Sequence, residues 1–155
     1  MTIYELLLFV HIMAAIVWVG GAVASQVISF RVLKAGDAGR KATLAGELEW
    51  MGTRVFTPAS GILFLFGIFL VINGNWSWGE PWIGGGITIW LVSTVLGIAF
   101  FGPELGRIQK LTDAEGADSS AVMTRVDRLL LVSRVELGLL ILAVFLMSAK
   151  PGGNI

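Results

Sequence analysis

Hydrophobic residues gather into four long stretches of this chain, with short polar segments between them. The stretches cover residues 6–30, 55–72, 83–101 and 129–147. Each is close to the ~20 residues that a helix rising about 1.5 Å per residue needs to cross ~30 Å of hydrocarbon. The pattern therefore predicts an all-α fold, an antiparallel bundle of four transmembrane helices.

The polar segment before the second stretch has a helical pattern of its own. Leu44, Leu48, Met51 and Val55 follow one another at spacings of four, three and four, which places them on one face of a helix. We expect this helix to continue into the second span, with Pro58 bending the join. The bundle is therefore expected to have helical extensions beyond the bilayer, on the cytoplasmic side.

A break around Gly116 precedes the last span, and Asp118 or Ser119 is the candidate N-cap of a long final helix. Because the four spans and their extensions use up the chain, no room remains for a second domain. We expect residues 1–155 to form a single four-helix transmembrane domain.

The composition is typical of a membrane protein, since 55% of the residues are hydrophobic, 14% are charged and the mean hydropathy is +0.82. The chain contains no cysteine, which excludes disulfides, thiolate metal sites and cysteine nucleophiles. The first stretch follows no basic segment and is too long for the apolar part of a signal peptide, so we interpret it as a membrane span.

Lysine and arginine are unevenly distributed although the formal net charge is zero. The connection between the first and second spans contains five of them and that between the third and fourth contains four, whereas residues 73–82 contain none. Basic connections tend to face the cytoplasm. The distribution therefore predicts a multi-pass protein with its N-terminus and C-terminus both outside.

Trp76, Trp78 and Trp82 lie in and beside the short connection that is expected outside. Amphipathic indole rings are enriched at headgroup depth, so an interfacial aromatic belt is the first interpretation. A platform on which a sugar or a base stacks is the alternative.

The stretch HIMAAIVWVGG contains the only histidine of the chain, His11. His11, Trp18 and Ser25 are spaced by seven and share one face of a helix, beside two small-xxx-small patterns that begin at Gly20 and Gly21. One interpretation is a seam where another helix packs closely. The other is that Gly21 makes space for a flat cofactor beside His11 and Trp18. His11 is accordingly either a structural or interfacial residue, or a ligand or proton carrier.

The last span contains two charged residues, Arg134 and Glu136. Thirteen residues separate Glu136 from Lys150, about 20 Å of helix, so Glu136 is expected within the membrane and Arg134 near its cytoplasmic edge. The two are about 200° apart around the helix and need other partners. We expect Arg54 to pair with Glu136, and Glu104 to pair with Arg134. Such an intramembrane network is either a structural clamp, or a polar pocket for an anionic ligand, a proton path or a docking site.

Five stretches of the sequence carry a resemblance to a known family: LLLFVHIMAAIVWVGGAVASQ, EWMGTRVFTPASGILFLFGIFLV, GNWSWGEPWI, FGPELGRI and RLLLVSRVELGLLILAVFLM. Over these stretches, which cover almost the whole chain, the sequence resembles a family of small bacterial integral membrane proteins of unknown function. The resemblance implies four transmembrane helices in the bacterial cytoplasmic (inner) membrane.

More remotely, a histidine followed seven residues later by tryptophan and then by glycine is similar to helices of copper-resistance D-type membrane proteins and of the small membrane protoporphyrinogen oxidase. That similarity implies copper handling or haem binding at this helix. The Pro-Arg pair and the second histidine of the oxidase pattern are absent here, where the chain reads AVASQVISFRV. Met13, Met147 and His11 form no recognisable soft-ligand motif for copper. A haem held by His11 would take its second axial ligand from Met147, from another subunit, or from neither.

Three classes of function follow from these observations. Because the chain has one histidine, no cysteine and no catalytic motif, a non-catalytic subunit or assembly factor of a larger membrane complex is the favoured interpretation. A haem- or copper-associated membrane redox protein using His11 is the first alternative, and a small transporter is the second. The expected partners are the lipid bilayer and other membrane subunits or further copies of the chain, with no nucleic acid.

Overall fold

The structure is a computed structural model that describes residues 1–152, without the side chains of Ala38 and Ala42. Within these residues every regular element is a helix, so the predicted all-α fold is confirmed. The expected single domain of residues 1–155 includes residues 153–155, which lie outside the described residues.

Four continuous helices make up the bundle, and each is long and apolar enough to cross a membrane. They run over Ile3–Ala35, Gly39–Asn73, Pro81–Glu115 and Ser120–Ala149. A π-helical turn divides each of the first three, which gives α1 (Ile3–Ala15), α2 (Gly21–Ala35), α3 (Ala38–Met51), α4 (Thr57–Asn73), α5 (Pro81–Leu96) and α6 (Gly102–Glu115), while the fourth is α7 (Ser120–Ala149).

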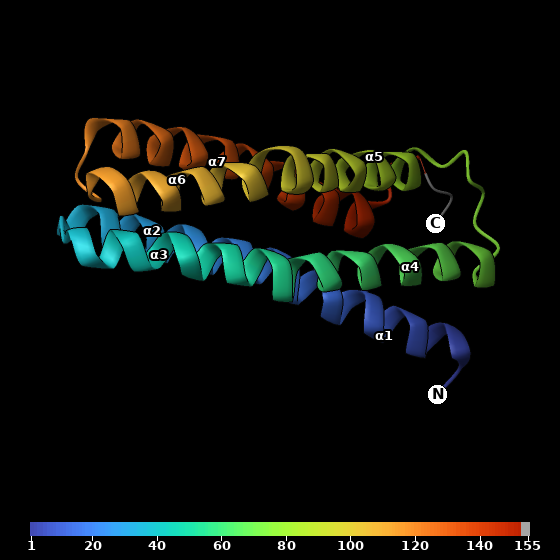
Figure 1. Cartoon of the computed structure of the whole chain (residues 1–155). Coiled ribbons are helices and arrows are strands. Elements are labelled where there is room, and N and C mark those ends of the chain that lie inside the picture. Colours follow the sequence, from blue (N-terminus) through green and yellow to red (C-terminus); the bar gives the residue numbers. More distant parts are fainter. Residues whose placement is uncertain (153–155) are drawn as a thin grey trace.

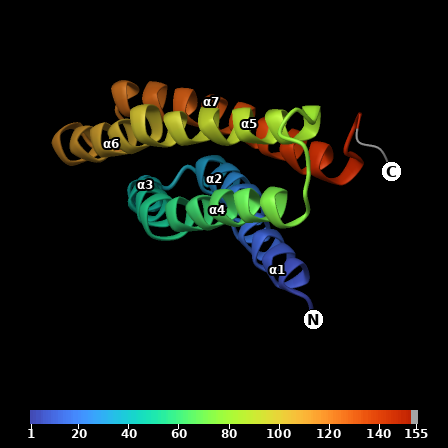
Figure 2. The same ribbon diagram turned by 90° about the vertical axis from the view of Figure 1, so that its right-hand side faces the viewer.

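Successive long helices run antiparallel (Figure 1). The helices α1 to α4 lie on one side of the bundle and α5 to α7 lie on the other, as the view turned by 90° makes plain (Figure 2). One end, called here the basic end, holds the α2–α3 and α6–α7 connections. The opposite end, called the terminal end, holds the start of α1, the end of α7 and the α4–α5 connection (Figure 1).

Local signals in the sequence fix where helices begin and end. A capping box opens α1, in which the Glu5 N–H donates to the Thr2 hydroxyl at 3.2 Å and the Thr2 N–H donates to the Glu5 carboxylate at 2.8 Å. The Ser119 hydroxyl caps α7 by accepting from the Val122 N–H at 3.2 Å, so the structure selects Ser119 from the two candidate N-caps. Gly116 makes the break before it with a φ of 89°, a conformation that favours glycine.

Two of the π-helical turns end two residues before a proline. The turn Gly52–Phe56 precedes Pro58, and the turn Gly97–Phe101 precedes Pro103. Proline donates no backbone hydrogen bond, and its ring clashes with the carbonyl group four residues earlier. A wider turn at this point lets the helix continue past the proline. The join at Pro58 is therefore a π-helical turn inside one continuous helix.

An apolar core holds the basic end together, where α3, α6 and the first half of α7 meet. Its buried members are Ala45, Leu105, Ile108, Val122, Leu129 and Leu130. The helix predicted through Leu44, Leu48 and Met51 is confirmed as α3, and Leu48 packs against this core. The polar extensions thus form the tightly packed end of the bundle.

Large hydrophobic side chains cover the outside of the long helices. Ile16, Val95, Ile98 and Phe145 are examples, with exposed fractions of 58%, 60%, 75% and 60%. Contiguous apolar surface of this kind is not tolerated in water. In a bilayer these side chains contact lipid, as expected for helices that span a membrane.

One buried carboxylate joins α6 to α7 at the basic end. Glu104 is 2% exposed and accepts from Arg125 at 2.8 Å and from Arg107 at 3.4 Å. Arg107 lies one turn further along α6, while Arg125 comes from the first turns of α7. Because the α6–α7 connection is short, the start of α7 lies beside the carboxylate.

From the sequence we expected Glu104 to pair with Arg134, and Arg54 to pair with Glu136, and the ion pairs in the structure are different. Among the described residues no ion pair joins Arg134 to Glu104 or Arg54 to Glu136. Arg134 is nine residues beyond Arg125, about 13 Å along α7, which puts it out of reach of Glu104. The side chains of Arg54 and Arg134 are exposed.

Replacing Glu104 should therefore weaken the basic end of the bundle. We expect Glu104→Gln to lower the free energy of unfolding by about 1–3 kcal/mol, because two guanidinium groups lose a charged partner. Denaturant unfolding in detergent micelles measures this change. Asp127→Asn is the control, since Asp127 is exposed on α7 and forms no ion pair among the described residues. Equal stability of the two variants would contradict the role of Glu104.

Candidate functional site

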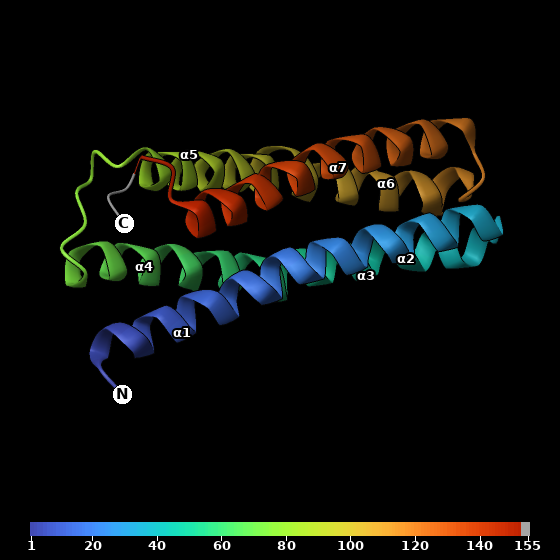
Figure 3. The same ribbon diagram turned by 180° about the vertical axis from the view of Figure 1, so that it is seen from behind.

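A cavity of about 670 Å³ opens in the terminal half of the bundle. It lies between two pairs of helices, because α1 packs mainly on α4 and α5 packs mainly on α7. Towards the terminal end α1 diverges from α7, as the view from behind makes clear (Figure 3). The volume is within the range of about 300–1,000 Å³ that is usual for small-molecule and cofactor sites.

His11 lies in the wall of this cavity, held by a hydrogen bond to the neighbouring helix. Its Nδ1 is 2.8 Å from the backbone carbonyl oxygen of Leu63 on α4. A carbonyl oxygen only accepts, so Nδ1 carries the proton and donates it. In the neutral ring Nε2 is then the unprotonated nitrogen, which is the form that binds a metal or accepts a hydrogen bond. A backbone partner of this kind orients many metal-binding histidines.

A glycine on α4 makes room for the imidazole ring. A Cβ atom at Gly67 would lie 3.2 Å from Cε1 and 3.4 Å from Nδ1 of His11. A larger residue would push the ring away from α4 and from the Leu63 carbonyl group. On α5, Gly86 makes room for Met147 in the same way, because a Cβ atom at Gly86 would overlap the methyl group of Met147.

Aromatic rings close the cavity towards the middle of the bundle. Trp18 is buried and packs with Ala59 and Leu140. Trp90 stacks on Phe64 with ring centroids 3.8 Å apart and 12° between the planes. The Nε1 of Trp90 donates to the Ser60 carbonyl oxygen at 3.1 Å, so its polar atom is satisfied by the backbone of α4. Trp90 therefore presents the apolar surface of its indole ring to the cavity.

The rim of the cavity at the terminal end combines two tryptophans with one cation. Trp76 and Trp82 meet edge to face, with centroids 5.3 Å apart and an interplanar angle of 87°. Lys150 Nζ lies 4.6 Å from the centroid of Trp76 and 5.4 Å from that of Trp82. This arrangement is a cation–π contact with two rings.

The structure brings several of the sequence-predicted site residues together and separates others. His11, Trp18 and Met147 all line the cavity. Gly21 does not, because Phe56 occupies the space in front of it, and its neighbour Gly20 lines the cavity instead. Gly21 therefore belongs to the packing seam, the first of the two interpretations of this stretch. The charged residues Arg54, Glu104, Arg134 and Glu136 are absent from the residues that line the cavity.

The three outer tryptophans also differ from a simple interfacial belt. Trp82 is 6% exposed, whereas Trp78 is 54% exposed. Both line the cavity together with Trp76. Their position in the cavity wall is compatible with a stacking surface, while the sugar or base expected on it stays a prediction.

Sequence reasoning missed Gly67, which lies against His11, Trp90, which packs in the cluster of Trp18, and Lys150 at the rim of the cavity. The His11–Leu63 contact joins positions 52 residues apart, and no local pattern indicates such a contact. The run Gly84–Gly86 was a usable signal, because three successive glycines inside an apolar helix indicate close packing or a nearby ligand.

The side chains around the cavity suit some groups better than others. Among residues 1–152, no group of three or more His, Cys, Asp and Glu side chains could hold a metal ion. A haem brings four nitrogen ligands of its own and needs one or two from the protein, which His11, alone or with Met147, would supply.

Comparison with known proteins identifies the family. Residues 5–151 match the family described as "Predicted integral membrane protein (DUF2269)". The chain belongs to this family, as the resemblance in the sequence indicated, and is an integral membrane protein. No curated protein and no solved structure matches the chain.

Two glycines of α4 provide a matched test of the packing around His11. We expect Gly67→Ala to destabilise the protein by about 1–3 kcal/mol, because the imidazole ring must move away from α4. Gly61→Ala should be neutral or slightly stabilising, since no atom lies within 4 Å of a Cβ atom at that position. Thermal unfolding in detergent compares the two. A Gly67→Ala variant as stable as Gly61→Ala would show that His11 is not closely packed.

Proposed function

We propose that this membrane protein binds a flat, mainly apolar molecule in its cavity and contacts it through Nε2 of His11. Haem is the candidate. The observation that carries the proposal is the hydrogen bond from Nδ1 to the Leu63 carbonyl oxygen, which leaves Nε2 unprotonated in a ring that lines the cavity. A histidine that only packs in a helix seam requires no cavity beside it.

The residues around the cavity fit such a group in size and in chemistry. His11 would supply an axial nitrogen, and Met147 would supply a second ligand or pack against the ring. Trp18 and Trp90 present apolar indole surface to the cavity and exclude water. Bound haem would supply one-electron redox chemistry, while the protein holds and orients it.

Of the three classes expected from the sequence, the haem-associated protein is the one that this geometry favours. A non-catalytic subunit or an assembly factor requires neither a cavity nor an oriented histidine. A small transporter requires a path across the membrane, whereas Trp18, Leu140 and Trp90 close this cavity towards the middle of the bundle. The cavity is therefore better suited to holding a molecule than to passing one across.

The charge distribution gives the proposed orientation. Of the eleven Lys and Arg residues of the sequence, only Lys150 lies at the terminal end. By the positive-inside bias the basic end faces the cytoplasm and both termini face outward, in the inner membrane of a bacterium. The cavity then opens in the outer half of the bilayer.

Absorbance of the purified protein tests the proposed function. Protein produced with haem available should show a Soret band, and His11→Ala should lose it because the axial nitrogen is gone. Met13→Ala is the control, since Met13 is 43% exposed on the same helix and does not line the cavity. Absence of the band from the unaltered protein, or its retention in His11→Ala, would refute the proposal.

Single cysteines test the orientation, because the chain has no cysteine of its own. Ser77→Cys, in the exposed α4–α5 connection, should react with an impermeant thiol reagent added to intact cells. Asp113→Cys, exposed near the end of α6, should react only after the cells are opened. The reverse pattern would overturn the assignment of the basic end to the cytoplasm.

A further inference from the structure

We infer that the cavity receives its ligand sideways from the lipid, through an opening between α1 and α7, and that this ligand carries an anionic group that binds Lys150. The inference rests on the proposed function in using the same cavity, and it names the class of ligand: an amphiphile with an apolar body and an acidic end.

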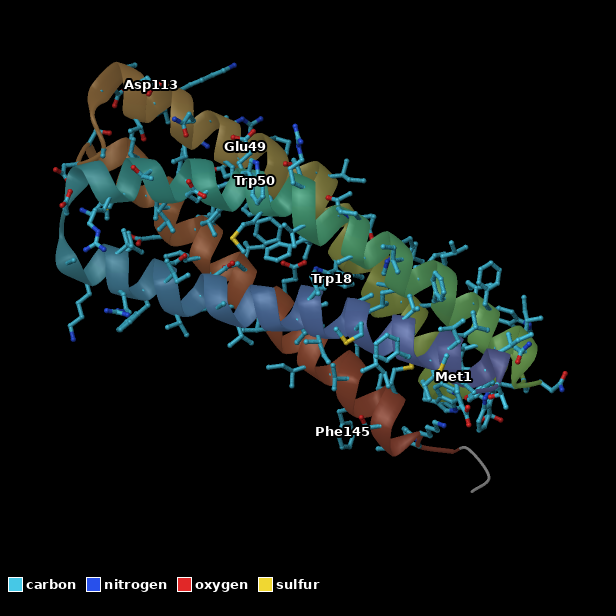
Figure 4. The ribbon with its side chains drawn as sticks, turned by 90° about the horizontal axis from the view of Figure 1, so that it is seen from below. Met1, Trp18, Glu49, Trp50, Asp113 and Phe145 are labelled. Atoms are coloured by element: carbon cyan, nitrogen blue, oxygen red, sulfur yellow. The ribbon has the colours of Figure 1, made fainter. Side chains whose placement is uncertain are left out.

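The opening is bordered by aliphatic side chains that both line the cavity and are exposed. On the first long helix these are Leu8 and Ile12 of α1 and Ile16 in the π-helical turn after it, with exposed fractions of 37%, 46% and 58%, and on α7 Val144 is 45% exposed. The polar Ser148, which is also exposed on α7, has its hydroxyl donating to the Val144 carbonyl oxygen at 2.8 Å. The view from below shows that the first half of α1 and the part of α7 near Phe145 point in different directions (Figure 4). An opening bordered by aliphatic side chains faces hydrocarbon, so a molecule dissolved in lipid enters it without meeting water.

Lys150 is the reason for inferring that the ligand is anionic. Among the residues that line the cavity it is the only lysine, and no arginine, aspartate or glutamate is present there. Its Nζ lies over Trp76 and Trp82 and forms no ion pair among the described residues. Indole rings hold an ammonium group in place without neutralising it. A cation that has no ion pair among residues 1–152 and lies beside an apolar cavity therefore attracts an anionic group more strongly than it would in water.

The acidic side chains Glu5 and Glu80 at the terminal end do not act as the anionic partner of Lys150. Glu5 is engaged with the Thr2 backbone in the capping box of α1. Glu80 lies just before α5 and forms no ion pair with Lys150. The backbone of Lys150 is fixed as well, because it ends α7 with a φ of 43° and its N–H donates to the Leu146 carbonyl oxygen at 2.9 Å. The ammonium group is thus anchored at the rim.

The short distance between the apolar wall of the cavity and Lys150 indicates that the ligand is an amphiphile. Met147, which shares the cavity wall with His11, precedes Lys150 by about one helical turn, roughly 5 Å. A body that lies beside Met147 and His11 therefore has its outer edge at the level of Lys150. The carboxylates of a porphyrin and the phosphate of an anionic phospholipid both present this chemistry, an acidic group at one end of an apolar body.

Paired probes that differ only in charge test the inference. Ligand-free protein in a neutral detergent is titrated with haemin and with haemin dimethyl ester, which has the same iron porphyrin but no carboxylates. It is also titrated with phosphatidylglycerol and with phosphatidylcholine that carry the same brominated chains. Porphyrins and brominated chains both quench tryptophan fluorescence, and Trp18, Trp76, Trp78, Trp82 and Trp90 line the cavity.

We expect the acidic member of at least one pair to bind about tenfold more tightly than its neutral counterpart. Lys150→Met should abolish this preference, whereas Lys110→Met, exposed on α6 at the basic end, should retain it. Ile12→Phe combined with Ile16→Phe should slow binding at least threefold by narrowing the opening, while Leu6→Phe, exposed on α1 away from the cavity, should not.

The outcomes separate this inference from the proposed function. Equal binding of the porphyrin and its ester, with no preference between the lipids, would overturn the role of Lys150 and leave a cavity for a flat molecule. A preference for phosphatidylglycerol without porphyrin binding would support an acidic lipid as the ligand and refute haem. Binding of none of the four probes would refute both. A preference that persists in Lys150→Met, or unchanged binding rates in the Ile12/Ile16 variant, would overturn the corresponding half of the inference.

Discussion

A chain that crosses hydrocarbon must satisfy its backbone hydrogen bonds internally, and this constraint governs the whole molecule. It explains why every regular element of the described residues is a helix and why large aliphatic side chains lie on the outside. It also explains how the chain accommodates proline. Pro58 and Pro103 have no N–H to donate, and a π-helical turn just before each proline lets the helix continue through the apolar region.

Different contacts hold the helices together at the two ends of the bundle. At the basic end apolar residues of the polar extensions form a core, and the buried Glu104 holds Arg107 and Arg125. At the terminal end the helices pack as two separate pairs, α1 with α4 and α5 with α7. In lipid there is no hydrophobic gain from bringing apolar helices together. The pairs can therefore diverge, and the space between them is the cavity.

The site depends on close approach at a few small residues. Gly67 allows the imidazole ring of His11 to lie against α4, which brings Nδ1 to the Leu63 carbonyl oxygen. The same bond decides which ring nitrogen is unprotonated. The proposed chemistry of the cavity thus follows from a glycine on one helix and a histidine on another, and Lys150 adds the single charge at the rim.

The sequence by itself determined the class of the protein and most of its fold. The length of the apolar stretches predicted four spanning helices, and the spacing of Leu44, Leu48 and Met51 predicted a helical extension. Both follow from local physics, since hydropathy and periodicity act within one helix. The capping position at Ser119 is local in the same sense, because its partner is three residues away.

Only the tertiary structure decided which residues meet across helices. The sequence singled out His11, Trp18 and Met147, yet the cavity that unites them is formed by four helices whose relative tilt no local pattern encodes. The ion pairs illustrate the same limit. Glu104 was expected to pair with a charge of the last span, but the short α6–α7 connection places Arg125 beside it. Partners in a bundle depend on where each connection sets the register of antiparallel helices, and that register is a property of the packed structure.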